Sequence, residues 1–185
     1  MKRISIFILL VLFSLSLTAC SFFRKNKVEI SNDKQSLYFD GTVVMPEKIT
    51  GQAGLLMIPF KAGPGVAATN NLDRLSLYIV KSISDCFKDE NIGLRILSSA
   101  ETKDADLVLK GYIVNVDEPK GIINKFRKKK NQLETKGQII DIKTGEIVVD
   151  FSSSIYSEKR ENLNELARQT GKAIANFILD HIGEK

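Results

Sequence analysis

The chain has 185 residues, and its 27 lysines and arginines stand against 22 aspartates and glutamates, a formal net charge of +5. This length fits one domain, and the positive excess is too small to be typical of a nucleic-acid-binding protein. A single histidine and two cysteines also argue against a zinc site, which needs three or four such ligands.

The first 19 residues have the pattern of a signal peptide. Lys2 and Arg3 form a short positive region. Residues 4–17 then form an apolar run of roughly 14 residues, shorter than the about 20 that a bilayer-spanning helix needs. We therefore predict a signal peptide over residues 1–19, which is removed from the mature protein.

Cys20 follows this segment directly. The stretch LTAC, residues 17–20, resembles the lipobox of bacterial lipoproteins, in which the cysteine takes a diacylglycerol and the chain is cut before it. The resemblance implies cleavage between Ala19 and Cys20 and acyl chains on Cys20; the alternative is a free cysteine at the end of an anchor helix. Two or more acyl chains hold a protein stably on a membrane. Ser21, in place of the aspartate that retains such lipoproteins in the inner membrane, implies the periplasmic face of the outer membrane.

Residues 20–41 are predicted to be the lipidated cysteine and a polar tether. The 21 residues after the cysteine reach at most about 70 Å when fully extended. As a flexible coil their typical span is about 25 Å. Such a tether would keep the following domain near its membrane.

The first half of the domain predicts a strand–helix–strand unit. Residues 42–46 favour a short strand, and residues 53–60 (AGLLMIPF) form a continuous apolar run that is typical of a central strand. From residue 71 to residue 90, apolar side chains fall three and four apart, as in an amphipathic helix. Residues 94–97 favour another strand, which should run parallel to the strand before the helix.

The second half of the domain shows a two-residue periodicity, which predicts strands, and then a helical pattern. Residues 105–119 favour a long strand, and residues 134–155 favour a hairpin that turns at Thr144 and Gly145. An apolar stripe from Leu163 to Ile178 predicts a second amphipathic helix. Together the elements predict an α+β fold, a five- or six-stranded mixed sheet with two amphipathic helices on one face, in one periplasmic domain over residues 42–185.

The order of these elements resembles the periplasmic lipoprotein superfamily that includes the curli-secretion lipoprotein CsgG and the penicillin-binding-protein activator LpoB. The resemblance rests on residues 105–111 (ADLVLKG), residues 141–146 (DIKTGE) and the strand end at residues 58–60. It covers roughly residues 53–182 and implies a non-catalytic domain that assembles with other envelope proteins.

Two features depart from that superfamily. The insertion at residues 118–132 is short and cationic, and a lysine or arginine facing lipid at the bilayer midplane costs about 2–4 kcal/mol, which argues against a membrane-crossing hairpin. The predicted tether is also too short to cross the periplasm, which argues against an activator that reaches the inner membrane.

Two patterns that could carry chemistry have simpler interpretations. Residues 63–68 (GPGVAA) match G-x-G-x-x-A, but the helix pattern starts later and no acidic residue follows the next strand, so we predict a flexible loop. Glu101, Asp104 and Asp106 could bind calcium, but they lack the EF-hand spacing, so we predict a solvated turn.

The remaining candidate ligands are single residues. His181 has no second histidine or cysteine pair beside it, and Cys86 lies on the apolar side of the first helix, where a small buried side chain is the favoured interpretation over a reactive thiol. We therefore expect no metal, no cofactor and no enzymatic activity, while a hydrolase that uses only carboxylates stays open.

A run of basic residues is the most distinctive feature of the mature chain. Five of the six residues from 125 to 130 are basic, and the exception is a phenylalanine. The run consists of Lys125, Phe126, Arg127, Lys128, Lys129 and Lys130. The simpler interpretation is a solvated loop. The functional one is contact with anionic lipid, peptidoglycan or an acidic partner, because each basic residue near an anionic membrane contributes about 1 kcal/mol. Nucleic acid is a poor partner for a lipoprotein outside the cytoplasm.

These observations predict a lipid-anchored, non-enzymatic accessory or assembly protein of a cell-envelope complex, with an envelope protein as its partner. The alternative is an accessory of a periplasmic enzyme that binds the cell wall or a small ligand.

Overall fold

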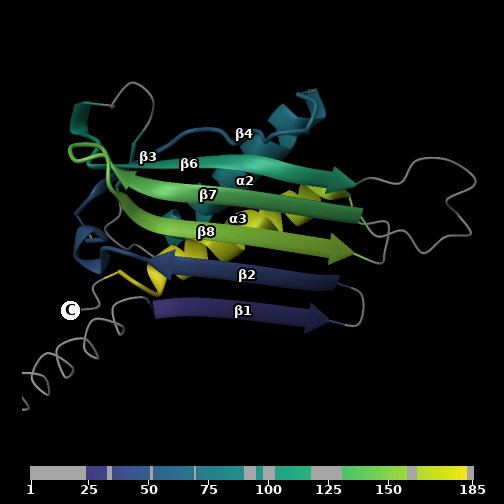
Figure 1. Ribbon diagram of the computed structural model, residues 1–185, viewed down its shortest axis with the longest axis horizontal. Helices are drawn as coiled ribbons and strands as arrows, with labels where there is room; N and C mark the ends of the chain where they lie inside the picture. Colours follow the sequence, from purple (N-terminus) through teal and green to yellow (C-terminus); the bar gives the residue numbers. More distant parts are fainter. Residues whose placement is uncertain are drawn as a thin grey trace, which may run out of the picture.

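The computed structural model describes residues 24–32, 35–50, 52–68, 70–89, 95–97, 103–117, 131–157 and 162–182. These residues form one mixed sheet with two helices packed on one of its faces (Figure 1). The predicted α+β class, the mixed sheet and the pair of helices on one face are therefore confirmed.

The sheet is largely antiparallel and has a parallel part at one side. Its order is β1-β2-β8-β7-β6-β3-β5, and β4 pairs with β6. β3 runs parallel to β5 and to β6, so the predicted strand–helix–strand unit is β3–α2–β5. The elements are β1 (Arg24–Asn32), β2 (Gln35–Val43), the 3-10 helix η2 (Pro46–Lys48), β3 (Gly54–Met57), β4 (Lys61–Ala62), α2 (Asn70–Asp89), β5 (Arg95–Leu97), β6 (Leu107–Asp117), β7 (Asn131–Asp141), β8 (Ile147–Ser157) and α3 (Leu163–Leu179).

The prediction of a tether over residues 20–41 is wrong for the part of that segment that the structure describes. β1 and β2 pair with each other, and β2 pairs with β8 over its whole length. Leu37, Phe39 and Val43 alternate with half-buried residues along β2 and are buried in the core. The polar residues before Leu37 obscured this two-residue period. The sheet has eight strands instead of five or six because β1, β2 and the short β4 all join it.

An aromatic cluster ties β2 to the rest of the core. The ring of Phe39 lies 6.0 Å from that of Phe151 on β8 and 5.1 Å from that of Phe177 on α3, measured between centroids. Gly41 leaves room for Phe177, since a Cβ at this position would lie 2.5 Å from the ring. Aromatic pairs contribute about 0.5–1.5 kcal/mol beyond the area they bury. β2 is therefore an integral strand of the core.

The two helices approach each other closely. Asn162 caps α3 by accepting a hydrogen bond from the Asn164 amide at 3.1 Å. The Ser82 hydroxyl of α2 donates to the Arg168 carbonyl of α3 at 2.8 Å. Gly171 allows this approach, because a Cβ at this position would lie 2.5 Å from the Ile79 carbonyl oxygen.

A buried carboxylate closes one end of the sheet, which we call the turn end because it carries the β7–β8 turn. Asp141 accepts hydrogen bonds from the amides of Lys143 at 2.8 Å and Thr144 at 3.0 Å, and it pairs with Lys48 of η2 at 2.8 Å. Gly145 has the positive φ, 74°, that the predicted turn requires. The hydrogen bond from Lys48, the amides and the charge of Lys48 lower the Asp141 pKa to about 2.

Gly171→Ala should destabilise the protein. Alanine has the higher helix propensity by about 1 kcal/mol, but the new methyl group would clash with the Ile79 carbonyl, and overpacking costs about 1–3 kcal/mol. We expect urea unfolding to show a net loss of stability. Asn176→Ala, at an exposed site of the same helix, is the matched control and should be neutral or slightly stabilising. A more stable Gly171→Ala variant would contradict the close helix packing.

The Asp141 ion pair should make stability depend on pH in the acid range. Because the folded state lowers the Asp141 pKa from 3.8 to about 2, its contribution to stability is essentially complete above about pH 5 and is lost as the pH falls towards 2. Asp141→Asn keeps an oxygen for the turn amides but removes the charge, and Lys48→Met removes the other partner. Both variants should show a shallower fall in the free energy of unfolding between pH 4 and 2. If the free energy of unfolding fell as steeply with pH in both variants as in the wild type, the Asp141–Lys48 ion pair would not be the cause of the acid dependence.

Candidate functional site: the helix-free face of the sheet

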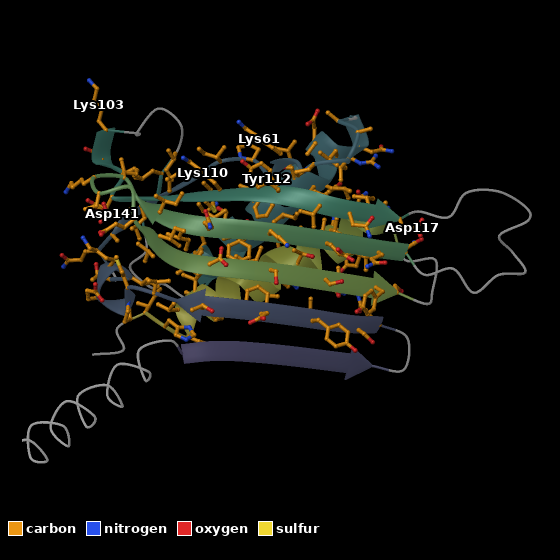
Figure 2. All side chains as sticks on the ribbon, in the orientation of Figure 1. Lys61, Lys103, Lys110, Tyr112, Asp117 and Asp141 are labelled. Atoms are coloured by element: carbon orange, nitrogen blue, oxygen red, sulfur yellow. The ribbon has the colours of Figure 1, made fainter. Side chains whose placement is uncertain are left out.

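The face of the sheet opposite α2 and α3 carries no second layer among the described residues (Figure 2). We call it the outer face. Side chains alternate between the two faces of a strand, so on β2, β7 and most of β8 every second residue is buried against the helices and the residues between point to the outer face. Most of these outward residues are only half-buried or exposed, so the outer face is open to a partner or ligand.

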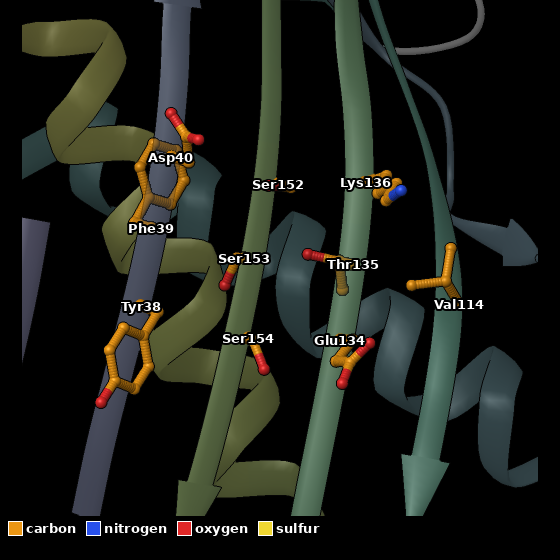
Figure 3. Close-up of a pocket in the computed structure, with 10 residues that line it drawn as sticks. All are labelled: Tyr38, Phe39, Asp40, Val114, Glu134, Thr135, Lys136, Ser152, Ser153 and Ser154. Carbon is orange, nitrogen blue, oxygen red and sulfur yellow. The ribbon is translucent and has the colours of Figure 1, made fainter. Parts of the chain in front are cut away.

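The outer face has a shallow hollow of about 180 Å³ over its central strands (Figure 3). None of its lining residues belongs to a helix, which places the hollow on the outer face. The lining residues are Tyr38, Phe39, Asp40, Val114, Glu134, Thr135, Lys136, Ser152, Ser153 and Ser154.

The strand register explains the hollow. Ser154 of β8 stands between Tyr38 of β2 and Glu134 of β7 in one row across the sheet. Ser152 stands between Asp40 and Lys136 in the next row. Neighbouring strands are about 4.8 Å apart, so each short serine side chain is flanked on both sides by a longer one. The serines form the floor and the β2 and β7 residues form the rims.

Polar contacts hold the rims in place. The Glu134 carboxylate accepts hydrogen bonds from the side-chain amides of Gln132 and Asn115, the second at 3.5 Å. The Tyr38 ring lies 5.6 Å from the Tyr156 ring between centroids, and this contact supports Tyr38 at the rim of the hollow. Hydroxyls, carboxylates, an ammonium group and aromatic rings together suit recognition of a polar ligand or a polar protein surface.

A band of lysines borders the hollow on the side of β4 and β6 (Figure 2). Tyr112 of β6, 50% exposed, stands between Lys61 of β4 and Lys136 of β7 in the row that also holds Ser152. Lys110 lies two residues before Tyr112 and is also exposed. The sequence analysis did not identify this band, because its members come from three strands that are far apart in the chain.

The residues predicted to form the anchor and the basic contact lie outside the described residues. This holds for Ala19 and Cys20 and for the basic run Lys125, Phe126, Arg127, Lys128, Lys129 and Lys130. Both stay predictions. The two strands that flank the basic run, β6 and β7, end and begin at the edge of the sheet opposite the turn end (Figure 1).

The other candidate ligands have structural roles. His181 is buried, and its Nδ1 lies 2.7 Å from the Phe177 carbonyl oxygen. Asp106 accepts a hydrogen bond from the Gly54 amide at 3.1 Å and lies 3.6 Å from the Lys143 ammonium group, while Glu101 lies outside the described residues. Within the described part of the chain, no three histidine, cysteine, aspartate or glutamate side chains gather as metal ligands.

Residues 63–68 form a loop, and Cys86 lies at the edge of the core. In the glycine-rich loop, the Gly63 amide donates to the Ile113 carbonyl at 2.8 Å and Gly65 has φ 81°. α2 begins only at Asn70, too late for a helix N-terminus to hold a pyrophosphate in this loop. Cys86 packs against the core, but it is half-buried and not fully buried as predicted. Among the described helices, none combines the length and hydropathy needed to span a bilayer.

Comparison with known proteins identifies the fold but no family. No protein-family model and no curated protein sequence matches this chain significantly. Among solved structures, two dodecamers of PelC from Paraburkholderia phytofirmans are similar to this chain. A point variant of PelC has 11% sequence identity and a TM-score of 0.57, and PelC in another crystal form has 12% identity and a TM-score of 0.52. Each comparison covers 77% of this chain and 96% of the PelC chain.

A lipoprotein is also among the similar structures. GNA1162 from Neisseria meningitidis matches with 14% identity and a TM-score of 0.41, covering 69% of this chain and 99% of that one. At identities this low the comparisons show the PelC fold and nothing finer, so membership of the CsgG and LpoB superfamily stays a prediction.

Proposed function

We propose that this protein is a lipid-anchored, non-enzymatic accessory or assembly component of a cell-envelope complex, held by acyl chains on Cys20 at the periplasmic face of the outer membrane. The LTAC stretch after a short apolar segment supports the anchor.

The open outer face is the observation that carries the assembly role. It spans the central strands β2, β8, β7 and β6, combines aromatic, hydroxyl and charged side chains, and has no covering layer among the described residues. A sheet face with a core on one side only and polar residues on the other offers a broad, rigid surface for a protein partner. The dodecamers of the similarly folded PelC show that this fold occurs in a large assembly.

The hollow favours a second candidate function, recognition of a cell-wall or small polar ligand on behalf of a periplasmic enzyme. Its volume of about 180 Å³ corresponds to roughly six water molecules, so it would hold one small polar group or one unit of a polymer. Co-sedimentation with peptidoglycan sacculi that weakens both in Lys136→Ala and after neutralisation of residues 125 and 127–130 would favour this function.

Cys20→Ala should abolish anchoring. Without the thiol no diacylglycerol can be attached, so we expect uncut precursor in the inner-membrane fraction and no incorporation of labelled palmitate. Cys86→Ala, which changes the other cysteine, is the control and should be processed like the wild type. If Cys20→Ala still reached the outer membrane, the anchor would be wrong.

A photo-reactive side chain on the outer face should capture the partner. Tyr112→p-benzoylphenylalanine preserves the shape of an aromatic residue that is 50% exposed. Leu77→p-benzoylphenylalanine, on α2 and 60% exposed, is the matched control on the helix-covered side. We expect irradiation of whole cells to give discrete protein adducts from position 112 that are missing from position 77. Glycan adducts at position 112 would favour the second function, and identical adducts at both positions would contradict a docking role for the outer face.

A further inference from the structure

The correction of the tether changes how far the domain can be from its membrane. The sequence alone predicted 21 linking residues and a reach of about 70 Å. Because β1 begins at Arg24, only three residues lie between Cys20 and the sheet, and the four residue steps from Cys20 to Arg24 span at most about 14 Å. Part of the sheet must therefore stay close to the leaflet that holds the acyl chains.

The register shows which end of the sheet this is. Arg24 pairs with Val43, which pairs with Val149, which pairs with Ile139. This row crosses the turn end, a few residues from the β7–β8 turn, and Figure 1 shows β1 starting on the same side as that turn. β6 runs from this end to Asp117, a length of about 34 Å for its ten residue steps.

The turn end also exposes apolar side chains. Four large hydrophobic residues are exposed in the described part of the chain, and two of them, Ile142 at 43% and Ile147 at 39%, flank the same turn. They are separate from the outer-face Tyr112 and from Leu77 on α2. Solvent-exposed isoleucines beside a membrane anchor match the apolar boundary region of a lipid leaflet.

The charges at the turn end do not favour binding to an anionic membrane. The basic residues at the turn end include Arg24, Lys25, Lys48, Lys103 and Lys143, and the acidic ones include Glu47, Asp104, Asp106, Asp141 and Glu146, so the two signs balance. Lys48 is paired with Asp141 at 2.8 Å, and Lys143 with Asp106 at 3.6 Å. Attraction to anionic headgroups is therefore weak, and a contact through the two isoleucines would be insensitive to salt.

We propose that the turn end rests on the lipid leaflet that carries the anchor, with Ile142 and Ile147 in its interfacial region, and that the outer face stands upright from the membrane. This rests on the proposed lipid anchor at Cys20. It follows that Asp117 and Asn131, which bound the segment containing the basic run, lie about 34 Å farther out, well beyond the Debye length of about 8 Å.

Tryptophan fluorescence can test this orientation because the native chain has no tryptophan. The lipidated full-length variants Ile147→Trp and Asp117→Trp would be placed in phosphatidylcholine vesicles with and without brominated acyl chains. Both sites are exposed, so either variant should fold. We expect a blue shift and strong quenching by brominated lipid at position 147, unchanged in high salt, and neither effect at position 117.

A readout without tryptophan guards against an effect of the new side chain. Lys143 is 80% exposed. It should react more slowly with a membrane-impermeant amine reagent when the protein is held on vesicles than when the domain is in detergent-free solution. The reaction rate of Lys136, which is also exposed, should be the same in both preparations. Mass spectrometry of the same preparation reports the acyl groups. Acylated protein with no quenching at 147, or with equal quenching at 117, overturns the orientation alone. Protein without acyl groups overturns the anchor and the orientation together.

Discussion

The packing of two helices against one face of the sheet is the constraint on which the rest of the structure depends. Phe177 of α3 sits over Gly41 and against Phe39, and Gly171 brings α3 against α2. These contacts draw β2 into the core and place both helices on the same side. The opposite side keeps its polar residues and its open surface, so the one-sided core is also the physical origin of the candidate site.

The hollow on that surface follows from side-chain size and not from a loop or a domain boundary. Two serines on β8 lie between longer residues of β2 and β7 in consecutive rows. The site is therefore built on central strands, where antiparallel pairing fixes each backbone position. A rigid, shallow and mixed surface suits docking of a preformed partner better than enclosure of a small substrate, which needs a deeper cleft.

The turn end and the outer face have different proposed roles, the first beside the anchor and the second in binding a partner. Asp141 ties the turn to η2 through Lys48 and accepts hydrogen bonds from two turn amides, so the end nearest the predicted anchor is held by an ion pair and two hydrogen bonds. On the proposed anchor, such a domain would hold its outer face at a constant height and angle above the membrane. A long flexible tether would instead have let the face turn freely, at a cost in the entropy of binding any fixed partner.

Local sequence patterns were sufficient to predict the elements that carry their own periodic or turn signal. These elements are both helices, the strands at residues 54–57 and 107–117, and the turn at Gly145. Residues 24–41 were misassigned as a tether because their polar start outweighed the alternation of Leu37 and Phe39, and only pairing with β8 makes that alternation meaningful. The hollow, the lysine band and the nearness of Arg24 to the β7–β8 turn could not be predicted. Each depends on the register between strands distant in the chain, and register is set by tertiary packing. The sequence by itself determined the helices, the α+β class and the predicted anchor at Cys20. Tertiary structure alone decided which face stays open and which end lies nearest that anchor.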